Sequence, residues 1–213
     1  MFEKEKEELL EACLQLKEYK LISLTGGNIC LRVGEYCIVT PSGMLYEKMI
    51  PEDMVVTNMK GVVIEGQRKP SSDLSALIYM YENMPEVKAI IHTHQPYATA
   101  IGFANESLPA CMVTLIDANH DRVSVAPWTV SSDIGMGKLA CDYMGNATAV
   151  IMKHHGVITI GKTLEEALFS AVYLEEGSKT YVLARIMGSV PELSDEEIAK
   201  ESLGWQSYGQ HEQ

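Results

Sequence analysis

Short apolar runs rich in Val and Ile alternate along the chain with longer stretches in which apolar side chains recur every three or four residues. The short runs have the length and β-branched content of strands, and we expect strands at residues 28–33, 36–40, 53–58, 87–94, 122–128 and 148–160. The longer stretches predict helices near residues 3–19, 72–83, 95–104, 132–144 and 163–187, and a short final helix from Ser194. Alternating strands and helices are typical of an α/β fold in which helices cover one sheet. The pattern leaves the strand order open.

The helix starts near the C-terminus carry a local signal as well. Thr163 is followed three residues later by Glu166, and Ser194 by Glu197. Each pair forms a capping box, in which both side chains satisfy free backbone N–H groups at a helix start. Both starts are therefore expected at these residues.

Size and composition favour one globular domain that spans residues 1–213. The chain has 213 residues, and 46% of them are hydrophobic, which is enough to bury a full core. No apolar run approaches the roughly eighteen residues that a membrane-spanning helix needs. The first twenty residues are too charged for a signal peptide and have the pattern of an amphipathic helix. We therefore expect a cytoplasmic protein with no membrane partner.

The charge balance excludes one class of partner. The formal net charge is −12, whereas a nucleic-acid-binding protein needs clustered Lys and Arg to neutralise phosphates. A small anionic substrate stays open, because backbone amides can hold a phosphate whatever the global charge. The five cysteines show no CxxC spacing, so we expect reduced thiols and no thiolate zinc site.

Histidines follow two of the expected strands. His92 and His94 are one residue apart, so in a strand both side chains would point to the same face and could meet one ion. The same spacing also fits one buried, hydrogen-bonded histidine and one solvated histidine. His154 and His155 end another apolar run, and strand ends of one sheet can converge. Three histidine ligands would leave a metal position open, which is the arrangement used for catalysis.

Three further segments offer polar groups beside strands or helices. In "KPSSD", Asp73 follows two serines where a helix should begin, so it is either a helix cap or a carboxylate near the ion. The loops "TGGN" and "TPSG" carry small residues, hydroxyls and exposed amides that can surround a phosphate, and they can equally be ordinary turns. Neither matches a P-loop or a dinucleotide fingerprint.

Taken together and in order, these motifs resemble one family. "TGGN" at 25–28, "TPSG" at 40–43, "KPSSD" at 69–73, "HTH" at 92–94 and "HHG" at 154–156 are similar to the motifs of the class II aldolase/adducin-head family. The resemblance covers nearly the whole chain. It implies a three-layer α/β/α domain with a central, mainly antiparallel sheet, and a homotetramer with sites at subunit interfaces.

The resemblance also implies a role for each motif residue. His92, His94 and His155 would hold Zn²⁺ or another divalent metal ion, and His154 would not be a ligand. Asp73 would be the catalytic acid/base, and Tyr208 near the C-terminus would donate or accept a proton. The positions that would bind the substrate phosphate are Asn28, Ser42, Gly43, Ser71 and Ser72.

The implied activity is that of a zinc-dependent lyase acting on a small-molecule sugar phosphate. It would cleave a ketose 1-phosphate, such as L-fuculose 1-phosphate, to dihydroxyacetone phosphate and an aldehyde through a metal-stabilised enediolate. Thr40 and the sequence "HHG" favour this aldolase, as does the short chain. The alternative is an L-ribulose-5-phosphate 4-epimerase, which Asp73 in place of Glu, Asp117 and the terminal "YGQ" favour.

Other members of the family widen the choice. Related dehydratases and decarboxylases stay compatible with these motifs. An adducin-like binding module would lack the metal histidines, all three of which are present here, so an enzyme is expected.

Overall fold

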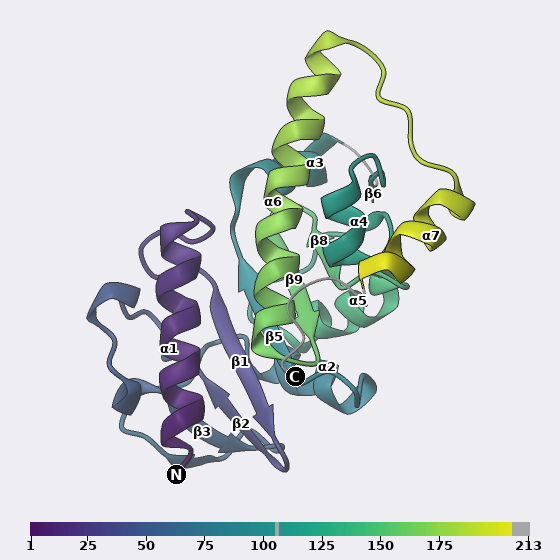
Figure 1. Ribbon diagram of the computed structural model, residues 1–213. Helices are drawn as coiled ribbons and strands as arrows, with labels where there is room; N and C mark the ends of the chain where they lie inside the picture. Colours follow the sequence, from purple (N-terminus) through teal and green to yellow (C-terminus); the bar gives the residue numbers. More distant parts are fainter. Residues whose placement is uncertain (105–106, 206–213) are drawn as a thin grey trace, which may run out of the picture.

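One mixed sheet organises the molecule in the computed structural model, which describes residues 1–104 and 107–205 (Figure 1). Within these residues the strand order is β4-β3-β2-β1-β5-β9-β8-β7-β6. The strands are β1 (Asn28–Val33), β2 (Tyr36–Val39), β3 (Val55–Asn58), β4 (Val63–Glu65), β5 (Ala89–Thr93), β6 (Ser107–Leu108), β7 (Val123–Ala126), β8 (Ala149–Met152) and β9 (Gly156–Gly161). Every neighbouring pair is antiparallel except β7 with β8, so the expectation of a mainly antiparallel sheet is confirmed.

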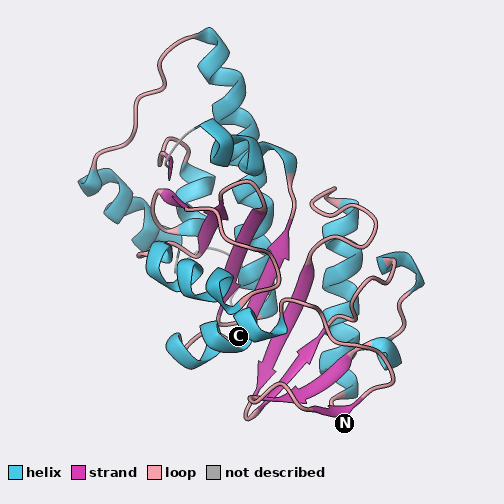
Figure 2. Ribbon diagram, turned by 180° about the vertical axis from the view of Figure 1, so that it is seen from behind, coloured by secondary structure: helices cyan, strands magenta, loops and turns pink. Residues whose placement is uncertain are grey.

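Helices cover both faces of this sheet (Figures 1 and 2). They are α1 (Glu3–Glu18), α2 (Leu74–Asn83), α3 (Pro96–Ala104), α4 (Val113–Asn119), α5 (Ile134–Met144), α6 (Leu164–Met187) and α7 (Asp195–Trp205), with short 3₁₀ turns at Tyr46–Lys48 and Pro51–Asp53. Successive strand side chains point to opposite faces. In β8, Val150 accordingly packs in the cluster with α2 and α5, whereas Ile151 packs in the cluster with α3, α4 and α6. Helix α1 joins α6 over the β1–β5 part of the second face. The result is the expected three-layer α/β/α fold.

The apolar run 148–160 is a hairpin rather than one strand. It divides into β8 and β9 around a tight turn in which the backbone N–H of His155 donates to the carbonyl of Met152 at 3.0 Å. His154 adopts a left-handed conformation in that turn, with φ 59°. This conformation is uncommon for residues other than glycine, so the sequence carried no usual turn signal there.

Helix α4 was not among the helices expected from the sequence, and it makes the stretch around Asp117 helical. Leu115 and Ile116 are fully buried within it, and they anchor it against α6 and α7 respectively. Strands β4 and β6 were also not expected, and they have three and two residues. Such short edge strands leave little periodic signal.

No helix in residues 1–104 and 107–205 is both long and apolar enough to cross a membrane.

Helices α2 and α5 approach each other closely at Gly137. A Cβ atom built at this glycine would collide with the backbone carbonyl group of Ala76 in α2, which cannot move aside as a side chain can. Gly177 in α6 also lies in a tight contact, but its neighbours are side-chain atoms of Leu115 at 3.2–3.4 Å. The two glycines therefore differ in how much strain a methyl group would cause.

We predict that Gly137→Ala lowers the free energy of unfolding by about 2 kcal/mol, because overpacking against a rigid backbone outweighs the better helix propensity of Ala. Gly177→Ala is the matched control and should change stability by less than about 1 kcal/mol. Urea unfolding followed by circular dichroism measures both. Equal effects of the two substitutions would contradict the proposed backbone contact.

Candidate functional site

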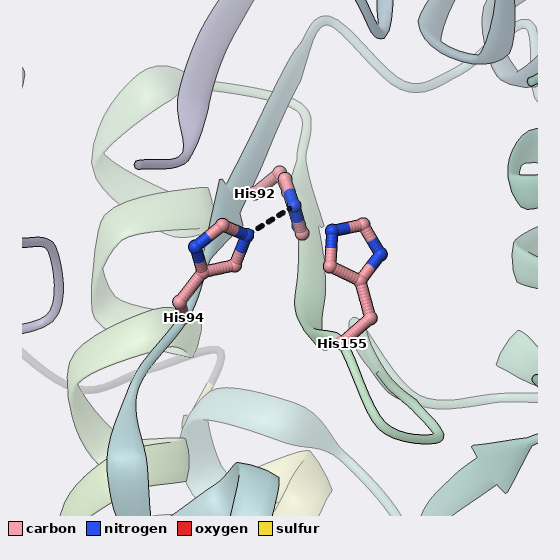
Figure 3. A group of neighbouring side chains, drawn as sticks. All are labelled: His92, His94 and His155. Atoms are coloured by element: carbon pink, nitrogen blue, oxygen red, sulfur yellow. Dashed lines mark hydrogen bonds between the residues drawn. The ribbon is translucent and has the colours of Figure 1, made fainter. Parts of the chain in front are cut away.

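Three histidines converge at the end of β5 (Figure 3). His92 lies within β5, His94 follows the strand end, and His155 comes from the β8–β9 turn. One ring nitrogen of each lies within 4.8 Å of the others, and the Nε2 atoms of His92 and His94 are 3.1 Å apart. Two nitrogen ligands of one tetrahedral zinc ion, each about 2.0–2.1 Å from the metal, are separated by a similar distance. The donor set and its spacing therefore fit a divalent ion such as Zn²⁺.

The surroundings keep these imidazoles neutral, which is the state that binds metal. Burial, together with the nearby His94 and His155, lowers the pKa of His92 to about 4. Partial burial also lowers the pKa values of His94 and His155. His92 Nδ1 lies 2.8 Å from the carbonyl oxygen of Val157. Donation of Nδ1–H to that carbonyl would leave Nε2 with a free lone pair.

Glycines let the backbone approach the rings. A Cβ atom at Gly26 would lie 2.9 Å from Nδ1 of His94, and one at Gly27 would lie 2.5 Å from the carbonyl oxygen of His92. Gly27 also has a positive φ of 83°, which favours glycine. A Cβ atom at Gly156 would collide with the Thr93 carbonyl. The glycines of "TGGN" and "HHG" are thus required by the packing around the histidines.

Asp73 is not a side-chain helix cap. It occupies the N-cap position of α2 but makes no side-chain capping hydrogen bond. Its carboxylate instead accepts a hydrogen bond from Nδ2 of Asn28 at 2.7 Å, and its Oδ2 atom lies 4.0 Å from Nε2 of His92. Both Asn28 and Asp73 are buried. The other Asn28 amide atom, Oδ1, has no partner among the described residues, so it is free to accept a hydrogen bond from a bound molecule.

The chain contains an internal comparison for Asp73. The tripeptide Ser-Ser-Asp occurs at 71–73 and again at 131–133, each time directly before a helix. Asp133 does cap its helix, because its carboxylate accepts from the backbone N–H of Gly135 at 2.7 Å. The same local sequence therefore gives a cap in α5 and a carboxylate turned toward Asn28 in α2.

Two loops form the rest of the site and are tied to each other through their backbones. The N–H of Ser42 donates to the carbonyl of Lys69 at 2.9 Å, and the N–H of Ser71 donates to the carbonyl of Thr40 at 3.0 Å. Between these bonds Pro41 and Pro70 form an antiparallel bridge. The "TPSG" and "KPSSD" motifs are thus neighbours in space.

A polar pocket with a volume of about 220 Å³ collects these groups. Its lining includes every predicted site residue that the structure describes: Asn28, Ser42, Gly43, Ser71, Ser72, Asp73, His92, His94 and His155. Tyr208 lies outside the described residues. The pocket also contains Thr25, Gly26, Gly27 and Pro41, which belong to the loops singled out in the sequence, and two residues to which sequence reasoning assigned no role, Ser131 and Ser132. The repeated Ser-Ser-Asp tripeptide was the one signal that could have pointed to Ser131 and Ser132.

Two other residues lie away from this pocket lining. His154 is exposed, and its ring stacks on Phe103 with a centroid distance of 5.3 Å, so it stands apart from the three-histidine group. Asp117 is in α4, where Glu201 and His120 are its titratable neighbours. It is not among the residues that line the pocket.

Comparisons with known proteins agree with this arrangement. A family model described as "Class II Aldolase and Adducin N-terminal domain" matches residues 7–182. A 5-deoxy-D-ribulose 1-phosphate aldolase from Bacillus thuringiensis serovar kurstaki is 31% identical over 212 residues, covering 99% of this chain and 99% of that relative. An L-fuculose phosphate aldolase from Escherichia coli is 29% identical over 203 residues, covering 95% and 94%. A solved structure of an L-fuculose 1-phosphate aldolase matches with a TM-score of 0.90 at 29% identity, covering 94% and 95%.

The low pKa of His92 predicts how stability depends on pH in the metal-free protein. Between pH 6.5 and about 4 the unfolded chain binds a proton at this histidine that the folded chain does not, so stability falls as pH falls. From pH 7.5 to 5.0 this one group should remove about 2 kcal/mol from the free energy of unfolding.

Urea unfolding of chelator-treated protein at both pH values tests this prediction. The variant His92→Gln is the control, since it keeps a hydrogen-bond donor but does not titrate, while other titrating groups affect both proteins alike. The wild type should lose more stability than the variant on acidification. An equal loss would mean that His92 is not held neutral in the folded state.

Proposed function

Because the chain belongs to the class II aldolase and adducin N-terminal domain family, we propose that it is a zinc-dependent aldolase that cleaves a ketose 1-phosphate. The products would be dihydroxyacetone phosphate and an aldehyde. One observation carries the proposal. The carboxylate of Asp73, which does not cap its helix, lies in the same pocket as the group His92, His94 and His155. Two relatives that match nearly the whole chain support the reaction class, since they are named 5-deoxy-D-ribulose 1-phosphate aldolase and L-fuculose phosphate aldolase.

The proposed chemistry divides between the metal and the side chains. When bound, the ion would act as a Lewis acid that stabilises the negative charge developing as the C3–C4 bond breaks. His92, His94 and His155 would hold it, and neutral imidazoles would leave its positive charge largely undiminished. Asp73 would move a proton at the carbon that carries the developing charge. Its hydrogen bond from Asn28 holds the carboxylate in one orientation for that step.

Hydroxyl-bearing loops would position the substrate. We assign the phosphate to the joined loops that carry Ser42, Gly43, Ser71 and Ser72, where side-chain hydroxyls and backbone amides can donate to its oxygens. Asn28 belongs to this set too, although one of its N–H groups is already donated to Asp73. Holding the phosphate there would turn the reacting bond toward the ion. Tyr208 would handle the proton of the hydroxyl that becomes the aldehyde.

The remaining expectations join this proposal. We propose that residues 1–213 form one domain, and that the protein works in the cytoplasm as a homotetramer. A 4-epimerase is the second candidate, because Asp73 stands where fuculose-phosphate aldolases typically carry Glu. Asp117, which was a reason to consider the epimerase, does not line the pocket of this chain.

The first experiment offers the zinc-loaded protein L-fuculose 1-phosphate and 5-deoxy-D-ribulose 1-phosphate. Release of dihydroxyacetone phosphate is followed by coupled oxidation of NADH. Steady release is expected, and it should stop when the metal is removed by a chelator and return when zinc is added. His94→Ala should lose its metal during purification and with it the release, leaving only weak zinc binding by His92 and His155.

Failure to release dihydroxyacetone phosphate with metal bound would contradict the aldolase proposal. The same protein would then be given L-ribulose 5-phosphate. Appearance of D-xylulose 5-phosphate would identify the epimerase, and the absence of stoichiometric metal would instead favour a binding module.

The two Ser-Ser-Asp tripeptides provide a matched test of Asp73. Asp73→Asn should keep the metal but lower kcat by about 10²–10⁴-fold, since the amide cannot transfer the proton. Asp133→Asn changes the same residue in the same local sequence, and Asn is an equally good N-cap, so kcat should stay within about threefold of wild type. Equal kcat values for the two variants would remove Asp73 from the mechanism.

A further inference from the structure

His94 is the one member of the three-histidine group that follows the end of β5 instead of lying within the strand or in the hairpin turn. The last paired residue of β5 is Thr93, which lies opposite Val157 of β9, and His94 follows beyond the ladder. Among the described residues its ring has a hydrogen-bond partner only in His92. His94 is also the most exposed of the three histidines. The backbone at Gly26 and Gly156 packs beside its ring, so the residues that follow His94 are left to hold its own backbone.

The next residue, Gln95, ties this segment to α6. Gln95 is completely buried. Its Oε1 atom accepts a hydrogen bond from the Thr93 hydroxyl at 2.6 Å, and its Nε2 atom donates to the carbonyl of Ala171 in α6 at 3.2 Å. Gln95 thus links Thr93, the residue before His94, to Ala171, which lies 76 positions after Gln95 in the sequence.

A second tie comes from Glu175, one helical turn after Ala171. Its two carboxylate oxygens accept the backbone N–H groups of Tyr97 and Ala98 at 2.9 and 3.0 Å. These N–H groups belong to the first turn of α3, where they have no partner within the helix. The negative charge of the carboxylate also lies at the positive end of the helix dipole, which is a favourable arrangement.

The carboxyl group of Glu175 lies in a place that disfavours its charged form. The side chain is half-buried between α6 and the start of α3, and burial raises the pKa of this carboxyl, which the two backbone donors partly offset. A carboxylate taken out of water is unfavourable unless hydrogen bonds compensate it. Here both compensating bonds go to the segment that begins three residues after His94.

We propose that Glu175, together with Gln95, is a positioning residue of the metal centre, which fixes the β5–α3 turn on α6 and thereby sets where His94 meets the ion. This inference deepens the proposed metal site and rests on it. Loss of either tie frees the His94 backbone, while His92 stays in the β5–β9 ladder and His155 stays in its hairpin turn.

The test measures zinc affinity without substrate, by competition with a chromophoric chelator. Glu175→Ala should raise the Kd for Zn²⁺ by about 10–100-fold, as is typical when the support of a metal ligand is removed. The visible spectrum of the Co²⁺-loaded variant should also change. Glu176→Ala is the matched control on the exposed side of the same helix and should leave Kd and spectrum unchanged.

A double-mutant cycle separates positioning from general destabilisation. If Glu175 acts through His94, Glu175→Ala should have no further effect on the residual zinc affinity once His94→Ala is present. A purely structural role would lower the affinity by the same factor in both backgrounds. Gln95→Met keeps the side-chain volume but removes both hydrogen bonds, and it should repeat the Glu175→Ala result. It therefore still tests the proposal if Glu175→Ala does not fold.

The outcomes also distinguish this inference from the proposed function. Wild-type protein that binds no zinc through His94 would contradict the metal site itself. Zinc-binding wild type, with folded Glu175→Ala and Gln95→Met variants whose Kd lies within about threefold of it, would overturn only the positioning role.

Discussion

The antiparallel pairing of β5 with β9 is the constraint on which the site depends. His92 stands opposite Ile158, and Thr93 opposite Val157, so the start of β9 must lie beside the end of β5. His155 immediately precedes β9, and the pairing therefore brings it to the two histidines of β5 across more than sixty positions of sequence. The contact between the His92 ring and the Val157 carbonyl crosses the same pair of strands. One set of backbone hydrogen bonds thus determines both the meeting of the three histidines and the orientation of the His92 ring.

The pairing of β1 with β5 brings the hydrogen-bonded pair Asn28 and Asp73 to the pocket. Asn28 begins β1 directly opposite His92, and from there its amide reaches Asp73 at the start of α2. The sheet face that bears Ile90 is covered by α2 and α5, so the starts of both helices reach the same end of the sheet as the histidines. Segments that are far apart in the sequence, from Thr25 to His155, therefore meet at this end of the sheet.

Much of this could be read from the sequence, because its strongest signals were short motifs next to strands. The histidines, Asp73, Asn28 and the loop residues at 42–43 and 71–72 were predicted as site residues by motif, and the structure brings them into one pocket. The β8–β9 hairpin could not be recognised, since its turn uses His154 in a left-handed conformation in place of glycine. Helix α4 was hidden because a polar stretch around Asp117 becomes helical only when its apolar side chains pack against other helices. Glu175 gives no local sign that its partners are Tyr97 and Ala98, which are long-range contacts of the folded chain.

The backbone tie between the loops at 40–43 and 69–73 has an evolutionary consequence. Their shape is maintained by main-chain groups and by the Pro41–Pro70 bridge, and no described side-chain hydrogen bond of Ser42 or Ser72 contributes to it. Mutations at these two positions can therefore alter the chemical character of the pocket wall while the loop geometry and the three-histidine group persist. A scaffold of this kind can diversify the small molecule that its pocket accepts through single substitutions, without first losing its fold or its three-histidine group.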